Sequence, residues 1–129
     1  MSLVRVLPAW FHAIADYAVG VLLIVVAIAA GNGAEEVGLG VVVGATVLLV
    51  SMLTKYPLGM AKVLPFTVHS AGDYLAAALL IAGPAILGIT GGIAAFYVVM
   101  GVAVLAVSLV TNYQYSDKRD WNRTTPVAA

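Results

Sequence analysis

The sequence predicts an all-α, polytopic membrane protein, a four-helix bundle made of two parallel tandem two-helix repeats. Hydrophobic residues make up 63% of the 129-residue chain, charged residues only 9%, and the mean hydropathy is +1.07. This composition lies outside the range of soluble domains and is typical of chains for which the bilayer is the solvent. Four apolar segments, each near the ~20 residues that a helix needs to cross the hydrocarbon core, supply the spans.

The apolar segments are expected to be helices, because a backbone in lipid must satisfy its own hydrogen bonds. They cover residues 9–30, 36–55, 66–87 and 92–113. Short glycine-rich turns follow the first and third segments, whereas a longer link, residues 55–65, holds two prolines and two lysines. The predicted order is therefore a hairpin, a link and a second hairpin.

The two hairpins are related in sequence. A shift of 57 residues aligns His12 with His69 and Asp16 with Asp73, and 19 of the 52 pairs that begin at positions 5 to 56 are identical. This internal similarity indicates duplication of a two-helix unit.

The repeats define the expected organisation of the chain, which is a first hairpin at 1–57, a second at 58–115 and a cytoplasmic tail at 116–129. Each repeat has two spans, so both copies enter the membrane from the same side. They are then related by a pseudo-two-fold axis along the membrane normal. The helices that lie on this axis are either the first and third or the second and fourth.

Charge predicts the orientation. All six basic residues lie on one side of the topology: Arg5, Lys55, Lys62, Lys118, Arg119 and Arg123. By the positive-inside rule both termini and the link face the cytoplasm, in the bacterial cytoplasmic (inner) membrane. A net charge of zero excludes a basic surface for nucleic acid, and the absence of cysteine excludes disulfides and thiolate metal sites.

Two His-x3-Asp pairs are the candidate site. His12 and Asp16 lie one turn apart on one face of the first helix, and His69 and Asp73 repeat this in the third. Polar stripes on the second and fourth helices end in the same layer, with Ser51, Thr54, Ser108 and Thr111 as supporting hydroxyls. The pairs form either two separate clusters or one merged cluster on the axis.

Glycine and aromatic residues have simpler expected roles. Gly40, Gly44 and Gly101 are expected to let helices approach closely, and Gly20, Gly38 and Gly83 are candidates for contacts in a homodimer or a larger membrane complex. Trp10, Tyr56, Tyr113, Tyr115 and Trp121 are expected to form an aromatic belt at the cytoplasmic interface.

The stretch "LTKYPLGMAKVLPFTVHSAGDYLAAALLIAGPAILG" (53–88), with the matching "LPAWFHAIADYAVGVLLI" (7–24), resembles the small bacterial four-helix membrane proteins built from SPW repeats. Those proteins similarly place His-x3-Asp near the start of the first and third helices. The Ser-Pro-Trp tripeptide itself is replaced here by "VAI" (26–28) and "GPA" (83–85). The resemblance implies topology and duplication, but it implies no activity.

Four hypotheses account for the His/Asp pairs. The first, which we prefer from the sequence, is structural: hydrogen bonds among the polar side chains hold the helices together in an accessory or scaffold-type membrane protein. We call this arrangement a structural polar lock. The second is binding or transport of protons or divalent cations through these four residues, because an ionisable residue within a membrane is a functional hypothesis by default. No motif for enzyme chemistry is found, so an enzyme is not expected.

The other two hypotheses involve a bound cofactor. His12, Asp16, His69 and Asp73 can supply an N2O2 site for a divalent metal, with a pairing similar to that of cation diffusion facilitator zinc transporters. His12 and His69 can alternatively act as the two axial ligands of a haem. The metal and haem hypotheses both require the first and third helices to bring their polar residues together.

Overall fold

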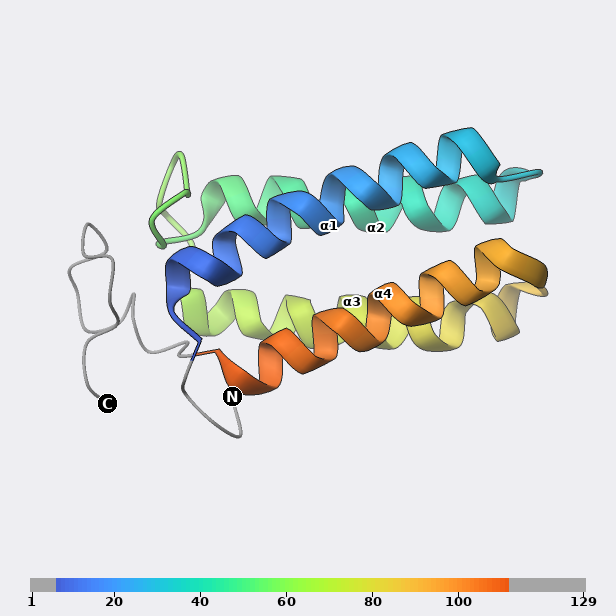
Figure 1. Ribbon diagram of the computed structural model, residues 1–129. Coiled ribbons are helices and arrows are strands. Elements are labelled where there is room, and N and C mark those ends of the chain that lie inside the picture. The colour runs from blue at the N-terminus through green and yellow to red at the C-terminus, as the bar shows by residue number, and fades with distance from the viewer. Residues whose placement is uncertain (1–6, 112–129) are drawn as a thin grey trace.

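The computed structural model describes residues 7–111, which form four helices in the predicted order (Figure 1). Their bounds are α1 Ala9–Ala30, α2 Ala34–Leu53, α3 Phe66–Leu87 and α4 Gly91–Val110. All four are long and apolar enough to cross a membrane, which confirms the predicted helical bundle. The second and fourth helices begin and end earlier than expected, so Thr54 and Thr111 cap them rather than lie inside them.

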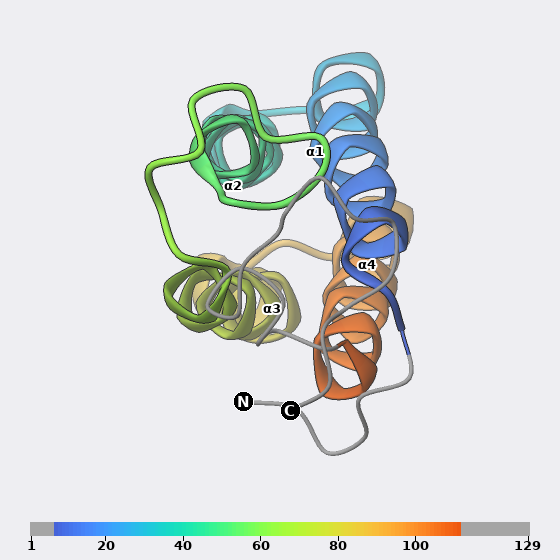
Figure 2. The same ribbon diagram turned by 90° about the vertical axis from the view of Figure 1, so that its left-hand side faces the viewer.

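The helices form two antiparallel hairpins, α1 with α2 and α3 with α4. Both tight turns lie at one end of the bundle, here called the turn end, and the link lies at the other, called the link end (Figure 1). Viewed along the bundle, the helices occupy the corners of a square in which α1 lies diagonally opposite α3 (Figure 2). Each helix of the second hairpin begins and ends 57 residues after its counterpart in the first.

Proline and glycine set the helix ends. Pro8 and Pro65 are the N-caps of α1 and α3, one residue before the first helical position of each helix. α3 ends at Gly88, whose φ of 72° lies in the left-handed region that glycine adopts without steric cost. The two prolines, at aligned positions, therefore start α1 and α3 at the same level of the two hairpins.

Glycine brings the helices of each hairpin into close contact, as predicted for Gly40, Gly44 and Gly101. A Cβ atom on Gly44 would lie 2.7 Å from the carbonyl oxygen of Gly20, so the two backbones nearly touch. A Cβ on Gly101 would lie 2.9 Å from the Cβ of Leu80. Small residues permit this approach in lipid, where van der Waals packing drives helix association.

Two of the three glycines suggested for a dimer interface instead pack internally. A Cβ on Gly20 would lie 2.7 Å from the side chain of Leu48, and one on Gly83 would lie 3.3 Å from Leu39, a residue of the other hairpin. Gly38 is different, because a Cβ there would have no atom within 4 Å apart from the backbone of its own helix. Gly20 and Gly83 therefore pack within the chain, and the dimer contact stays a prediction.

The buried interior has three layers. An apolar cluster on the turn-end side contains Leu23, Ala27, Val43, Ala76, Leu80, Ile89 and Tyr97. A smaller cluster at the link end contains Ala9, Ala13, Tyr56 and Phe66. The buried polar side chains of the two His-x3-Asp pairs lie between these clusters, so the structure places the candidate site inside the bundle.

The link after α2 is ordered by hydrogen bonds to the end of that helix. The carbonyl groups of Met52 and Leu53 accept hydrogen bonds from four backbone amides of the link, at 2.7 to 2.9 Å. These bonds satisfy acceptors that a helix C-terminus otherwise leaves without a partner. Gly59 is required in this fold, because a Cβ there would lie 1.8 Å from the carbonyl oxygen of Thr54.

Candidate metal centre

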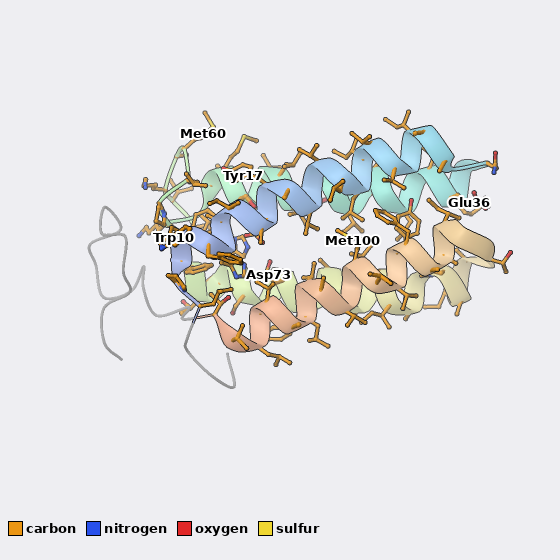
Figure 3. All side chains as sticks on the ribbon, in the orientation of Figure 1. Trp10, Tyr17, Glu36, Met60, Asp73 and Met100 are labelled. Carbon is orange, nitrogen blue, oxygen red and sulfur yellow. The ribbon has the colours of Figure 1, made fainter. Side chains whose placement is uncertain are left out.

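The two His-x3-Asp pairs converge into one buried group, here called the His/Asp cluster, which consists of His12, Asp16, His69 and Asp73. α1 supplies one histidine and one aspartate, and α3, the helix diagonally opposite, supplies the other two. All four residues are buried, and at most 7% of each is exposed. Figure 3 shows Asp73 between the hairpins, toward the link end. Of the two arrangements left open by the sequence, the merged cluster is the one observed.

Within the cluster the imidazoles and carboxylates alternate. The Nε2 atom of His12 lies 3.2 Å from Asp16 Oδ1 and 3.0 Å from Asp73 Oδ2. The Nε2 atom of His69 lies 3.1 Å from Asp16 Oδ2 and 2.9 Å from Asp73 Oδ1. Each carboxylate therefore bridges the two histidines, and each histidine contacts both hairpins.

Two threonines hold the outer nitrogen of each histidine. His12 Nδ1 lies 2.8 Å from Thr111 Oγ1, and His69 Nδ1 lies 2.6 Å from Thr54 Oγ1. Each threonine belongs to the opposite hairpin from its histidine. Short backbone contacts place them there, because Leu7 pairs with Thr111 beside the start of α1, and Leu64 pairs with Thr54 beside the start of α3.

The threonine hydrogen bonds determine which tautomer the histidines adopt. Thr54 Oγ1 donates its only proton to the carbonyl oxygen of Val50, and Thr111 Oγ1 donates to that of Val107. A hydroxyl that has already donated can only accept from the imidazole. Both histidines therefore carry a proton on Nδ1, and both direct Nε2 at the centre of the cluster.

Tyr56 is a further member of the site, and its expected place in the aromatic belt is wrong. Its side chain is fully buried, and its hydroxyl donates to Asp16 Oδ2 at 3.1 Å. Burial, together with the negative charge of Asp16, raises the pKa of Tyr56 far above its usual value, so the hydroxyl remains a donor. The available signal was its alignment with Tyr113 in the 57-residue shift, although Tyr113 lies outside the described residues.

The other predicted residues have different outcomes. Ser51 and Ser108 are fully buried as expected, but within residues 7–111 their hydroxyl groups form no hydrogen bond of standard geometry. Trp10 is 40% exposed near the link end, where an interfacial aromatic residue is expected. Tyr115 and Trp121, together with the basic residues of the tail, lie outside the described residues.

The donor set of the cluster fits a divalent metal ion. Zinc sites use imidazole nitrogen and carboxylate oxygen at about 2.0–2.2 Å, which corresponds to about 3.3 Å between neighbouring ligands of a tetrahedron. The Nε2 to oxygen distances of 2.9 to 3.2 Å are close to this, and one ligand atom from each residue lies within 4.8 Å of all the others. Metal-binding histidines usually donate their second N–H to an outer acceptor, which is the role that Thr54 and Thr111 have here.

A haem does not fit the same space. A porphyrin would have to lie between the two Nε2 atoms, where the carboxylate oxygens of Asp16 and Asp73 are already within 3.2 Å of both nitrogens. The ring of Phe66 also packs edge-on against His12, with ring centroids 5.1 Å apart. The geometry therefore favours a small ion over a planar cofactor.

Comparison with known proteins adds no relative. No protein-family model matches the sequence, and neither the curated proteins nor the solved structures contain a significant match. The resemblance to SPW-repeat proteins therefore stays a prediction from the quoted motifs. What can be inferred about function comes from the chemistry of the cluster.

Proposed function

We propose that this chain is an integral membrane protein that binds one divalent transition-metal ion, of the Zn²⁺ class, at the His/Asp cluster. The observation that carries the proposal is the convergence of two histidine Nε2 atoms and two carboxylates on one buried point. Two carboxylates match the charge of a divalent cation, and imidazole with carboxylate is a donor set suited to zinc and its neighbours. The threonines supply the outer hydrogen bonds that such a site needs.

The proposed location is the bacterial cytoplasmic membrane, with both termini and the link in the cytoplasm. The distribution of basic residues supports this orientation. It places the metal site in the cytoplasmic half of the bundle. On the turn-end side of the cluster the interior is filled by apolar side chains and Tyr97, which supports binding of an ion rather than its passage across the membrane.

The structural polar lock, which the sequence alone favoured, becomes the second candidate, and one observation favours it. When both imidazoles are protonated at Nε2 as well as at Nδ1, each Nε2–H lies 2.9 to 3.2 Å from two carboxylate oxygens, and these ion pairs join the diagonal helices without an added ion. A lock and a metal site predict different metal contents. The experiment below separates them.

The test is elemental analysis of the protein purified in detergent from cells grown with added zinc. We expect about one metal ion per chain, as the four-ligand geometry implies, and no Soret band. The His12→Ala/His69→Ala variant should lose the metal. The Tyr17→Phe/Tyr74→Phe variant is a matched control, because these residues directly follow the two aspartates and lie outside the cluster. A metal-free wild type at saturating zinc would leave the lock as the function of the cluster.

A further inference from the structure

Tyr56 holds one of the two carboxylate oxygens of Asp16. Both oxygens face the His/Asp cluster, because Oδ1 lies 3.2 Å from His12 Nε2 and Oδ2 lies 3.1 Å from His69 Nε2. The Tyr56 hydroxyl donates a hydrogen bond to Oδ2 at 3.1 Å. Either oxygen is therefore placed to bind a central ion, but Oδ2 has a donor besides the imidazoles.

The packing around Tyr56 fixes the position of its hydroxyl group. The ring is fully buried and contacts the rings of Phe66 and His69, with ring centroids 5.1 and 5.5 Å apart. The carbonyl oxygen of Tyr56 accepts a hydrogen bond from Lys62 Nζ at 3.0 Å, which ties its backbone to the link. Because the hydroxyl can move away from Asp16 only if this packing changes, the hydrogen bond is expected to persist when an ion enters.

Metal binding makes the two oxygens of Asp16 unequal. An ion takes the Nε2 lone pairs of both histidines, so the imidazoles no longer donate to the carboxylates. Oδ2 then still accepts from Tyr56, whereas Oδ1 has no other donor within residues 7–111. A hydrogen bond draws electron density from its acceptor, so Oδ1 is the stronger ligand. Asp16 should therefore bind the ion through Oδ1 alone, in the monodentate mode.

A monodentate Asp16 limits the number of donor atoms around the ion. Zn²⁺ is almost always tetrahedral in closed protein sites, and one ligand atom from each of the four residues is enough for it. Mg²⁺ and Mn²⁺ prefer octahedral coordination. In this buried cluster that geometry would require both oxygens of each carboxylate. Loss of Asp16 Oδ2 as a ligand therefore disfavours the octahedral ions more than it disfavours zinc.

We infer that Tyr56 is a positioning residue that determines the metal specificity of the site. Its hydrogen bond keeps Asp16 monodentate, which selects four-coordinate ions such as Zn²⁺ over octahedral ions such as Mn²⁺. Tyr56 does not touch the ion, because it acts through Asp16. This selection rests on the metal site proposed above, and it defines the class of ion that the site accepts.

The first test is the visible absorption spectrum of the full chain, purified in detergent and loaded with Co²⁺. Tetrahedral Co²⁺ absorbs strongly because it lacks a centre of symmetry, whereas octahedral Co²⁺ absorbs weakly. We expect strong bands in the wild type. In Tyr56→Phe, Asp16 Oδ2 is free to bind the ion, so the bands should be weaker at equal cobalt content. Weak bands in the wild type would overturn the role of Tyr56, and this result does not depend on the folding of the variant.

The second test is the ratio of the Zn²⁺ and Mn²⁺ affinities, measured by competition and followed by the electron paramagnetic resonance signal of free Mn²⁺. Tyr56→Phe removes an outer hydrogen-bond partner and should lower zinc affinity by about tenfold or more. Mn²⁺ gains a ligand atom in the variant, so the ratio should fall by at least about tenfold. A purely structural role would lower both affinities together, and an unchanged ratio would contradict the inference.

Tyr17→Phe is the matched control, because the Tyr17 hydroxyl donates to the carbonyl oxygen of Leu58 and not to the cluster. This variant should keep the wild-type bands and the wild-type ratio. Elemental analysis of the same samples tests the metal site separately. A wild type that binds neither Zn²⁺ nor Co²⁺ overturns the metal site together with the role of Tyr56, whereas bound Co²⁺ with weak bands overturns only the role of Tyr56.

Discussion

At the residue scale, the threonine at the end of each second helix determines what its histidine can bind. One hydroxyl donates to a carbonyl in the preceding turn and accepts from the histidine Nδ1. The imidazole is thus fixed both in orientation and in tautomer, with Nε2 available to the centre. Thr54 and Thr111 are positioning residues for the site, although neither is among its four central groups.

Removal of one of these hydroxyl groups should weaken metal binding. In Thr54→Val the shape of the side chain is kept, but the Nδ1 proton of His69 loses its acceptor. We expect zinc affinity to fall about 10- to 100-fold, the usual effect of an outer hydrogen-bond partner. Competition with a chromogenic chelator measures this affinity. Thr90→Val, at an exposed position of the turn end, is the control, and equal affinities in the two variants would contradict the assigned role.

Tyr56 should contribute to stability through its bond to a buried carboxylate. Tyr56→Phe removes this donor, and we expect a loss of about 1.5–3 kcal/mol in the free energy of unfolding. Tyr17→Phe is the control, because the Tyr17 hydroxyl donates to the carbonyl of Leu58 at an exposed position. That change should cost about 1 kcal/mol or less. Similar losses in the two variants, measured by denaturant unfolding in detergent, would refute the role of the Asp16 contact.

The stability difference between wild type and Tyr56→Phe should also depend on pH. The pKa of Tyr56 is raised in the folded protein by burial and by Asp16, so the unfolded chain loses this proton first. The stabilisation is therefore complete below pH about 10, the ordinary tyrosine pKa, and decreases as the pH rises further. Unfolding measured from neutral to strongly alkaline pH checks this, and a constant difference would contradict it.

Some of this residue-scale detail could be predicted from the sequence and some could not. The two His-x3-Asp pairs and the four hydroxyl residues follow from spacing and from the 57-residue shift. Convergence of the pairs could not be predicted, because it depends on which helices share a diagonal. Tyr56 was missed because it follows a helix, where a tyrosine near a lysine is typical of an interfacial residue, and only the fold of the link turns it inward.

At the scale of elements, Gly40 and Tyr97 are equivalent in the two hairpins but opposite in size. The Tyr97 ring crosses to α2, where its hydroxyl donates to the carbonyl oxygen of Glu36 and lies 2.5 Å from the place of a Gly40 Cβ. Figure 3 shows Glu36 at the turn end, so this contact lies far from the cluster. The absence of a side chain at Gly40 leaves a space in the first hairpin, and the Tyr97 side chain of the second hairpin occupies it.

This contact predicts different effects for two glycine substitutions on the same helix. Gly40→Ala places a methyl group against the Tyr97 hydroxyl and the Leu23 carbonyl, so it should destabilise the fold by about 1–3 kcal/mol. Gly38→Ala has open space and should be neutral, or stabilising by up to about 1 kcal/mol through helix propensity. Thermal unfolding in one detergent compares them. Equal melting temperatures would show that the two hairpins do not pack as described.

Helix number and approximate bounds were predictable, because four apolar runs with glycine and proline breaks leave few alternatives in lipid. The ends of α2 and α4 were placed too late. Hydropathy continues through Thr54 and Thr111, but the chain becomes extended there to pair with the segment that begins the opposite hairpin. This early ending is what allows the two threonines to reach the histidines.

At the scale of the whole molecule, a metal ion would join the two hairpins, because its ligands come equally from both. Zinc at 100 times its dissociation constant should then raise the free energy of unfolding by about 2.7 kcal/mol. The Asp16→Asn/Asp73→Asn variant should show no such increase. Thermal unfolding with and without zinc measures the effect, with Tyr17→Phe/Tyr74→Phe as the control. An unchanged wild type would contradict metal binding and favour the polar lock.

The equal division of the site between the hairpins has an evolutionary consequence. Each hairpin contributes one histidine, one aspartate and one threonine, and each threonine serves the histidine of the other half. A single ancestral hairpin cannot build the site alone, but two identical copies associated as a homodimer would bring all six groups together. Fusion of two such genes would then add only the link, and it would leave each half able to diverge at aligned positions such as Gly40 and Tyr97.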